Sequence, residues 1–197
     1  GEVVTMSVDW EHIPAKHRSL IKAFLDEADM SADVVKTVDF PPVYGVDIVV
    51  SCEKEKDLKS GSIYLKPTQF VLGIGCRRNT AFENIDGAIR QSLLKLQIDI
   101  SDIDMIASID VKKDEPGIKE FCERNRIDFV TYTADELMAV QGEFSASQFV
   151  REHVGVDNVC ERAAVLACSR ECNEAGKLVY KKHKYDRVTV AAARYPD

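Results

Sequence analysis

Three features are missing from this sequence, and each absence excludes a class of protein. The 6 cysteines among its 197 residues include no C-x-x-C pair, so a zinc site is not expected. No apolar run approaches the roughly 18 residues that cross a bilayer, and we see no signal segment at the start. The third missing feature is an excess of positive charge. The net charge is −7, which argues against nucleic-acid and membrane-surface partners. A reducing, cytoplasmic setting fits these cysteines best.

Apolar residues make up 45% of the sequence, enough for a folded core. From residue 70 onward, short apolar runs alternate with segments of helical periodicity. This alternation predicts a three-layer α/β/α domain over residues 70–197, with a mixed, mostly parallel sheet of about five strands. The expected strands are 70–74, 104–110, 127–132, 178–182 and 188–193, of which the last two form a hairpin.

Residues 1–69 indicate a smaller α/β segment, which we interpret as part of a central or linker region. Strands are expected at 3–8, 46–50 and 63–65, and Pro41-Pro42 interrupts the chain. Residues 18–29 have helical spacing with one apolar face. That face consists of Leu20, Ile21, Phe24, Leu25 and Ala28.

Helix starts are marked by capping signals, in which two side chains three residues apart each bind the other's backbone N–H. The four pairs are Thr80 with Glu83, Thr133 with Glu136, Ser145 with Gln148, and Asn158 with Glu161. Pro116 suits the first position of a further helix. Several of these helices follow a strand, so their N-termini lie where α/β sheets bind ligands.

The segment VLGIGCRRNT, residues 71–80, follows this pattern most clearly. Gly73 and Gly75 allow the backbone to turn tightly and to approach a ligand. The helix starting at Thr80 offers unpaired N–H groups and the positive end of its dipole, which favour an anion. Arg77 and Arg78 add planar donors suited to carboxylate or phosphate.

Three interpretations of this segment are open. It can be a dinucleotide-binding G-x-G-x-x-G motif with Asp110 on a ribose, although Arg78 occupies the place of the third glycine. It can be a structural turn with its arginines in solvent. It can also be a site for a ligand rich in carboxylates. Cys76 lies beside the arginines, where the pKa of a thiol tends to fall, and is a candidate nucleophile.

Three further segments supply candidate residues. DVKKDEPG, residues 110–117, is either a solvated loop or a set of carboxylates that share acid and base roles. GVDNVCE, residues 155–161, is a second glycine loop that enters a helix, and YKKHKYDR, residues 180–187, is a basic patch or a hydrated hairpin. The candidates are Asp110, Lys112, Asp114, Glu115, Gly155, Cys160, Glu161, Lys181 and Lys184.

Four segments together resemble one known family. GIGCRRN, SIDVKKDEPG, GVDNVCERAAVLA and KLVYKKHKYDRVTVAAA, in this order and spacing, look like the C-terminal domain of the cobalamin biosynthesis protein CbiG, the cobalt-precorrin-5A hydrolase. The same domain occurs alone in the CobE protein. Residues before 70 resemble the end of the family's central region, and its N-terminal domain has no counterpart here. Asn79 stands where the family often has glycine, and asparagine tolerates the left-handed conformation.

The resemblance implies a hydrolase that opens the δ-lactone of a corrin precursor and releases acetaldehyde. The resemblance assigns no catalytic residue, and our own hypothesis is that Asp114 or Glu115 acts as base and that backbone turns at 73–76 and 155–160 face anionic groups. The substrate's acetate and propionate side chains would be held by Arg77, Arg78, Lys181 and Lys184. No cofactor is implied, because cobalt arrives bound in the substrate.

The expected partners are this anionic tetrapyrrole, other enzymes of the cobalamin pathway and, to form a homodimer, a second copy of the chain. Two alternatives stand beside the hydrolase interpretation. The domain can be a non-catalytic module that holds or passes on a tetrapyrrole. A weaker alternative is a nucleotide-binding α/β domain.

Overall fold

The computed structural model describes residues 4–30, 35–38, 46–52, 62–145, 155–172 and 175–196. It divides the chain into two compact units, residues 1–68 (the N-terminal unit) and residues 69–196 (the C-terminal unit). Each unit has its own sheet and its own apolar core. Among the described residues, no helix is long and apolar enough to cross a membrane.

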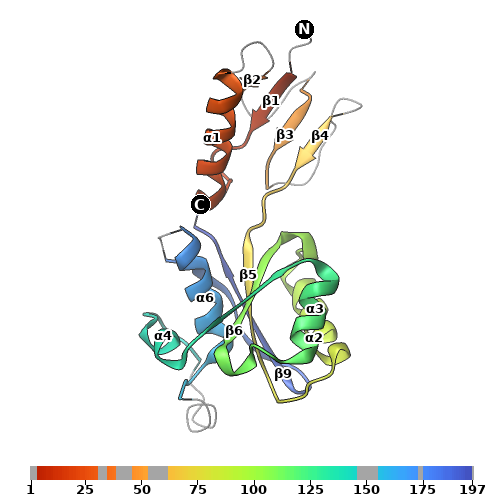
Figure 1. Cartoon of the computed structure of the whole chain (residues 1–197), viewed down its shortest axis with the longest axis vertical. Helices are drawn as coiled ribbons and strands as arrows, with labels where there is room; N and C mark the ends of the chain where they lie inside the picture. The colour runs from red at the N-terminus through yellow and green to blue at the C-terminus, as the bar shows by residue number, and fades with distance from the viewer. Residues whose placement is uncertain are drawn as a thin grey trace. The chain divides into compact units, whose positions relative to one another are not determined.

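The N-terminal unit is a four-stranded parallel sheet with a helix packed against it (Figure 1). Its elements are β1 (Val4–Val8), α1 (Ala15–Met30), β2 (Val35–Val38), β3 (Ile48–Val50) and β4 (Ile63–Leu65), in the sheet order β2-β1-β3-β4. The small α/β segment is therefore confirmed. Strand β2 was not predicted, because its residues, VKTV, form neither an apolar run nor a strict alternation.

The apolar face predicted for α1 is buried only in part. Ile21 and Leu25 pack against the core, whereas Leu20 is 65% exposed and Phe24 is 50% exposed. The two exposed side chains line a groove of about 450 Å³ together with residues of β3 and β4. Helical periodicity identifies an apolar face, but the width of the neighbouring sheet decides how much of it is covered.

The C-terminal unit contains a five-stranded mixed sheet in the order β7-β6-β5-β9-β8. β5 pairs in parallel with β6, and β6 with β7, whereas β9 runs antiparallel to both β5 and β8. The strands are β5 (Phe70–Cys76), β6 (Ile103–Ile109), β7 (Asp128–Tyr132), β8 (Lys177–Lys184) and β9 (Val188–Arg194), and the helices are α2 (Phe82–Leu96), α3 (Pro116–Asn125), α4 (Ala134–Ala139) and α6 (Val159–Cys172). The predicted architecture, including the terminal hairpin, is confirmed.

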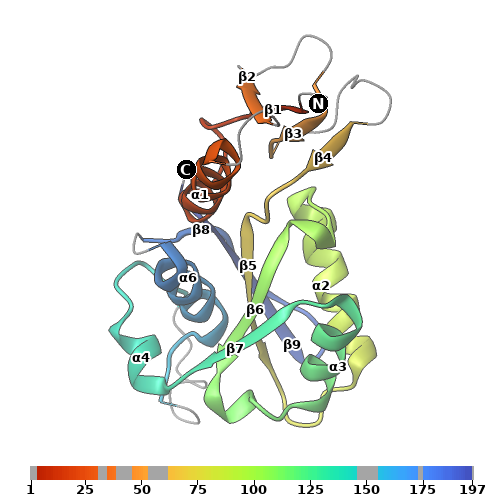
Figure 2. The same cartoon turned by 45° about the horizontal axis from the view of Figure 1, so that its top comes forward.

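Helices α2 and α3 cover one face of this sheet, and α4 and α6 cover the other (Figure 1 and Figure 2). Helix α6 packs closely on β5 because Gly73 has no side chain: a Cβ there would lie 1.7 Å from the carbonyl oxygen of Cys160. Ala163 and Ala164 are fully buried in the same layer. Small residues on both elements thus let the two backbones approach each other.

Two of the predicted helix caps form. Thr133 and Glu136 make the capping box of α4. Asn158 caps α6, because its Oδ1 accepts a hydrogen bond from the N–H of Glu161 at 3.0 Å. Pro116 occupies the first turn of α3. Short polar side chains therefore start these helices as their spacing predicts.

The capping box predicted at Thr80 is wrong. The N-cap of α2 is Ala81, which makes no side-chain cap hydrogen bond. The hydroxyl of Thr80 instead donates to the carbonyl oxygen of Arg77 at 2.7 Å. The helix predicted from Ser145 falls on residues 146–154, outside the described part of the chain.

Candidate functional site

The carboxyl edge of the five-stranded sheet gathers most of the predicted site residues. Parallel strands β5, β6 and β7 end there, and helices α2, α3 and α4 follow them in turn. The turn between β8 and β9 lies at the same edge, because Cys76 pairs with Val188. Gly155, before α6, has a φ of 73° and lies close to Ala134 at the start of α4. Ligands bind at this edge in α/β sheets.

The turn at this edge is made by residues 77–80, which we name the arginine turn. Asn79 has a φ of 54°, the left-handed conformation that asparagine tolerates. Gly73 and Gly75 lie inside β5, so the prediction that they form the turn is wrong. A dinucleotide-binding loop needs its glycines in the turn itself, and this geometry does not form one.

The β8–β9 hairpin holds one side of the arginine turn. The N–H of Arg77 donates to the carbonyl oxygen of Arg187 at 3.0 Å. In return, Nη2 of Arg187 donates to the carbonyl oxygen of Arg78, also at 3.0 Å. These residues are more than a hundred positions apart, so no local pattern indicated the contact. The side chains of Arg77 and Arg78 are exposed, and their backbone is fixed.

The loop after β6 holds the other side of the turn. Oε1 of Glu115 accepts a hydrogen bond from the N–H of Thr80 at 3.0 Å, and Oε2 accepts from Nζ of Lys112 at 2.9 Å. The side chain of Glu115 is 5% exposed and that of Lys112 is 10% exposed. Gly117 lies close by, since a Cβ there would be 2.4 Å from the carbonyl oxygen of Thr80. The predicted proximity of these two loops is thus observed.

The three carboxylates of this loop have separate partners. Asp110 accepts a hydrogen bond from the N–H of Val111 at 2.7 Å. Asp114 is 88% exposed and lies 3.6 Å from Nζ of Lys119. Glu115 is committed to Lys112 and Thr80 as described above. This geometry does not provide the closely coupled acid and base that their spacing suggested.

Burial is the main cause of the shifted pKa values of the two thiols Cys76 and Cys160. It raises the pKa of Cys76 to about 11, while Lys112 acts in the opposite direction. The expectation of a lowered pKa is therefore wrong, and Cys76 holds little thiolate near neutral pH. Burial likewise raises the pKa of Cys160 to about 12. Both are free thiols packed at the end of β5 and the start of α6.

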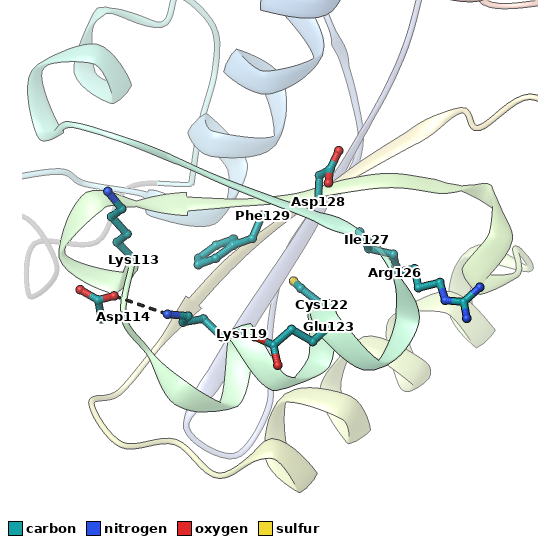
Figure 3. A pocket seen from close by; sticks show the side chains of 9 residues that line it. All are labelled: Lys113, Asp114, Lys119, Cys122, Glu123, Arg126, Ile127, Asp128 and Phe129. Atoms are coloured by element: carbon teal, nitrogen blue, oxygen red, sulfur yellow. Dashed lines mark ion pairs between the residues drawn. The ribbon is translucent and has the colours of Figure 1, made fainter.

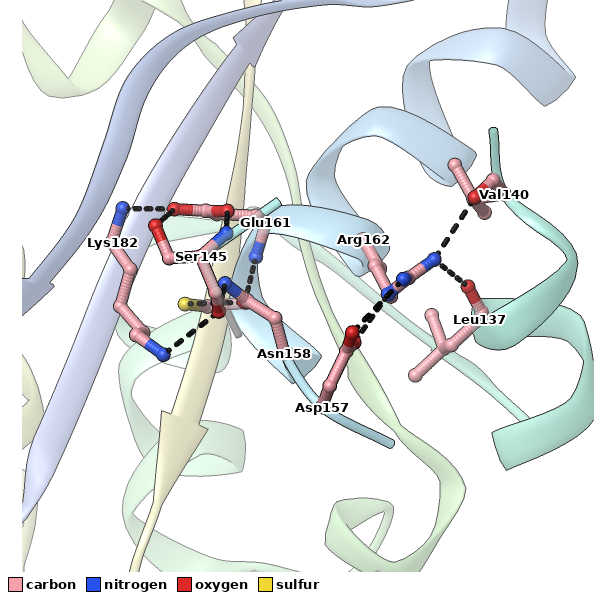
Figure 4. Close-up of polar contacts among 9 residues, drawn as sticks. Leu137, Val140, Ser145, Asp157, Asn158, Glu161, Arg162 and Lys182 are labelled. Carbon is pink, nitrogen blue, oxygen red and sulfur yellow. Dashed lines mark hydrogen bonds and ion pairs between the residues drawn. The ribbon is translucent and has the colours of Figure 1, made fainter. Parts of the chain in front are cut away.

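Glu161 lies at the start of α6, fully buried (Figure 4). Its carboxylate accepts hydrogen bonds from the N–H and the hydroxyl of Ser145, at 2.7 and 2.8 Å, and from the N–H of Lys182 at 2.6 Å. The oxygens of Glu161 therefore join the chain before residue 146 to strand β8. The carboxylate of Glu161 is therefore already satisfied by two main-chain N–H groups and one hydroxyl.

Arg162, which sequence reasoning did not single out, anchors the neighbouring segments (Figure 4). Its guanidinium binds Asp157 through Nε at 2.7 Å and Nη2 at 3.2 Å. Its Nη1 donates to the carbonyl oxygens of Leu137 and Val140, at 3.2 and 2.9 Å. The last residues of α4 are thereby tied to the loop that enters α6. In the sequence, the only sign of this role is that Arg162 is a charged residue in an apolar, alanine-rich helix.

The basic hairpin divides its side chains between structure and solvent. Lys181 and Lys184 are exposed. Lys182 donates from Nζ to the carbonyl oxygen of Ser145 at 3.3 Å. The ring of His183 stacks on Tyr180 with centroids 4.0 Å apart. Within residues 180–187, Lys181 and Lys184 are therefore the two exposed lysines available to a ligand.

A pocket of about 570 Å³ lies between α3 and the edge strand β7 (Figure 3). Its lining residues are Lys113, Asp114, Lys119, Cys122, Glu123, Arg126, Ile127, Asp128 and Phe129. Charges of both signs alternate around it, and Asp114 is the one predicted site residue in its wall. Within the described ranges, no group of three or more His, Cys, Asp or Glu side chains could hold a metal ion.

Comparison with known proteins agrees with the location of these segments. The family model described as cobalamin synthesis G C-terminus matches residues 70–193. The probable cobalt-precorrin-5A hydrolase of Methanocaldococcus jannaschii is 30% identical over 146 residues, which cover 72% of this chain and 45% of that protein. The cobalt-precorrin-5A hydrolase of Priestia megaterium is 31% identical over 144 residues, covering 73% and 37%. The chain thus spans less than half the length of these curated relatives.

A solved structure with a similar fold is that of CobE, a protein from the cobalamin (vitamin B12) biosynthetic pathway. The two chains superpose with a TM-score of 0.61 and 26% sequence identity. The superposition covers 64% of this chain and 90% of the CobE chain. The C-terminal unit alone is thus similar to nearly the whole of a separate protein.

Proposed function

Since this chain belongs to the family of the cobalamin synthesis G C-terminus, we propose that its C-terminal unit binds the anionic tetrapyrrole substrate of a cobalt-precorrin-5A hydrolase. The binding site is the carboxyl edge of the five-stranded sheet. In the complete protein, this site positions the δ-lactone of the substrate for attack by water, with release of acetaldehyde. Cobalt enters as part of the substrate, and the protein contributes no cofactor of its own.

The arginine turn is the observation that carries this proposal. Its backbone is held by Arg187 on one side and Glu115 on the other, while Arg77 and Arg78 are exposed. A guanidinium on a fixed backbone loses less freedom when it binds, and its planar donors match a carboxylate bidentately. The acetate and propionate groups around a corrin precursor are ligands of this kind.

The exposed lysines of β8 extend the positive surface. Lys181 and Lys184 lie on the hairpin whose tip contacts the arginine turn. Exposed cations on a chain with a net charge of −7 attract a polyanion locally despite the overall repulsion. They therefore suit a ligand that carries several carboxylates.

For the hydrolytic step we assign Asp114 as the base that activates water. Its side chain is 88% exposed, so water reaches it, and it follows β6 at the same edge as the arginine turn. Glu115 is the second candidate, but its two oxygens already accept from Thr80 and Lys112. A general base must contact the proton that it removes, which favours the accessible carboxylate.

A second candidate function is tetrapyrrole binding without turnover. It is supported by the superposition of this unit on 90% of CobE, a chain that contains little else. In that case the arginine turn and the lysines hold the ring, and Asp114 contributes only charge. A homodimer, contacts with other enzymes of the pathway and a cytoplasmic setting belong to both versions of the proposal.

The binding proposal is tested with the double variant Arg77→Ala/Arg78→Ala. Titration with uroporphyrin III, a fluorescent tetrapyrrole bearing acetate and propionate groups, should show about a hundredfold weaker affinity at low salt, since each charge-assisted hydrogen bond contributes about 1.5–3 kcal/mol. The affinity should also depend less steeply on salt. Arg90→Ala is the matched control, because Arg90 pairs with Asp86 on the exposed side of α2. Unchanged affinity of the double variant would refute the site.

The catalytic assignment is tested in the complete hydrolase. Asp114→Asn should slow acetaldehyde release from cobalt-precorrin-5A by about a hundredfold or more, the usual contribution of a general base, with little change in substrate affinity. Glu120→Gln, which changes a carboxylate that pairs with Arg124 on the exposed side of α3, should release acetaldehyde at the normal rate. Normal turnover by Asp114→Asn, with weakened turnover by the arginine variants, would favour the binding-only function.

A further inference from the structure

Glu115 has a charge of the wrong sign for its position. A carboxylate beside a turn that binds anions repels the ligand, and the repulsion grows as the site loses water. Both oxygens of Glu115, however, face protein donors: the N–H of Thr80 and Nζ of Lys112. Lys112 balances the charge, since the two side chains are 5% and 10% exposed. The acidic group therefore acts on the turn through the main chain of Thr80.

We propose that Glu115 and Arg187 are positioning residues that clamp the arginine turn from two sides, so that Arg77 and Arg78 are presented to the anionic substrate in one conformation. The inference rests on the proposed function of that turn. It assigns Glu115 a task different from that of a base.

The geometry of Thr80 explains why the clamp is needed. Thr80 is 2% exposed, so water cannot replace Glu115 as the acceptor for its N–H. A buried N–H without an acceptor costs about 1–3 kcal/mol, and the turn would reorganise to avoid that cost. Asn79, in the left-handed conformation, directly precedes Thr80. Losing the carboxylate acceptor of Glu115 would therefore also disturb the conformation of Asn79, which directly follows the two arginines.

Arg187 fixes the opposite side through its own backbone and side chain. It accepts from the N–H of Arg77 and donates to the carbonyl oxygen of Arg78. Its φ of 61° is in the left-handed region, at the tip of the hairpin that contacts the turn. The two clamps come from different segments, so each can be removed while the other stays.

The test compares Glu115→Ala with Glu115→Gln in titrations with uroporphyrin III. Glutamine keeps an acceptor for Thr80 and should change the affinity by no more than about twofold, whereas alanine should weaken it about tenfold, the effect of one unpaired buried donor. The salt dependence should match the wild type, because no binding cation is removed. Glu120→Ala, which removes a charge that pairs with Arg124 on the exposed side of α3, is the control. Tighter binding by both Glu115 variants, or equal effects of the two, would overturn the inference.

Two further measurements keep the test decisive if Glu115→Ala folds poorly. Arg187→Lys retains the charge at an exposed position but loses the planar donor, and should bind about threefold more weakly with an unchanged salt dependence; an unaltered affinity contradicts the clamp. Amide hydrogen exchange reports on the turn without any ligand. In Glu115→Gln the N–H of Thr80 should stay protected, and in Glu115→Ala it should exchange at least about tenfold faster.

The exchange measurement separates the two proposals. If the wild-type protein does not bind uroporphyrin III, the proposed function fails, while protection of Thr80 still decides whether Glu115 holds the turn. If the wild type binds and Thr80 exchanges equally in all variants, the site stands and the clamp is refuted.

Discussion

Two buried glutamates lie on opposite faces of the same sheet, and their partners differ in kind. Glu115, at the start of α3, accepts from one main-chain N–H and from the flexible side chain of Lys112. Glu161, at the start of α6, accepts from main-chain N–H groups on both oxygens, those of Ser145 and Lys182. One glutamate thus has a long side chain as one of its two partners, and the other accepts a main-chain N–H on each oxygen.

The difference teaches how the same residue serves different purposes. Glu161 fastens strand β8 and the chain before residue 146 to α6, in the layer where Gly73 lets the helix approach β5. Glu115 sits beside the exposed arginines and fixes a turn whose side chains are free to bind. A buried carboxylate with main-chain partners stabilises a packed interface. A carboxylate with a side-chain counter-ion can instead position a neighbouring binding turn while its own charge is balanced.

The largest expected loss of stability comes from displacing α6. This displacement would break the hydrogen bonds of Glu161 and leave those of Glu115 intact. Gly73→Ala puts a Cβ 1.7 Å from the carbonyl oxygen of Cys160, so strand and helix must separate. We expect a loss of about 4 kcal/mol or more in the free energy of unfolding, measured in urea. Gly87→Ala is the control: nothing lies within 4 Å of its added Cβ, and it should stabilise α2 by about 0.5–1 kcal/mol. Similar stability of both variants would contradict the close packing.

The direct comparison replaces each glutamate by glutamine. In Glu161→Gln the new amide group faces a main-chain N–H whichever way it turns, so the variant should lose about 3 kcal/mol of unfolding free energy. In Glu115→Gln the amide oxygen can face Thr80 while Lys112 moves toward water, and the loss should be about 1 kcal/mol. Urea unfolding at neutral pH measures both. Equal losses would show that the mobility of Lys112 is unimportant.

The smallest expected effect is on the stability at low pH, and it tests the ion pair between Asp157 and Arg162 of α6. The hydrogen bond from Arg162 is the main cause that lowers the pKa of Asp157. A lowered folded pKa means that the stabilisation is present above the ordinary aspartate pKa and is lost as the pH falls through the lowered value. Asp157→Asn should cost about 1 kcal/mol at pH 7 and flatten the loss of stability in acid. Urea unfolding at a series of pH values between neutral and about 2 measures this, and parallel profiles for variant and wild type would refute it.

Much of the fold could be predicted from the sequence because strands and helices of this length carry local signals. The apolar runs at β5, β6 and β7 alternate with helical periodicity, and the capping residues Thr133 and Asn158 act through neighbours three residues away. Asn79 in the left-handed conformation is a local property of that residue. Strand β2, with the residues VKTV, has neither an apolar run nor a strict alternation to signal it.

The candidate site was predictable only as a set of loops. Neighbouring parallel strands bring the arginine turn and the loop at residues 110–117 to one edge, and the contact between Thr80 and Glu115 agrees with this. The direction of the pKa of Cys76 was predicted wrongly, because burial outweighs the nearby cations. The link between Arg78 and Arg187 spans 109 positions, and no local pattern contains it.

The sequence by itself determined the order of strands and helices, the edge at which the loops gather and the residues with the right chemistry to bind an anion. Periodicity and capping are short-range properties, so they are legible in the chain. Tertiary structure alone decided that Gly73 allows close helix packing and that the N–H of Thr80 donates to Glu115 instead of joining a capping box. It also decided that Arg77 and Arg78 lie on a turn that is held on both sides. Each of these depends on burial or on a partner far along the chain, and both exist only after the chain has folded.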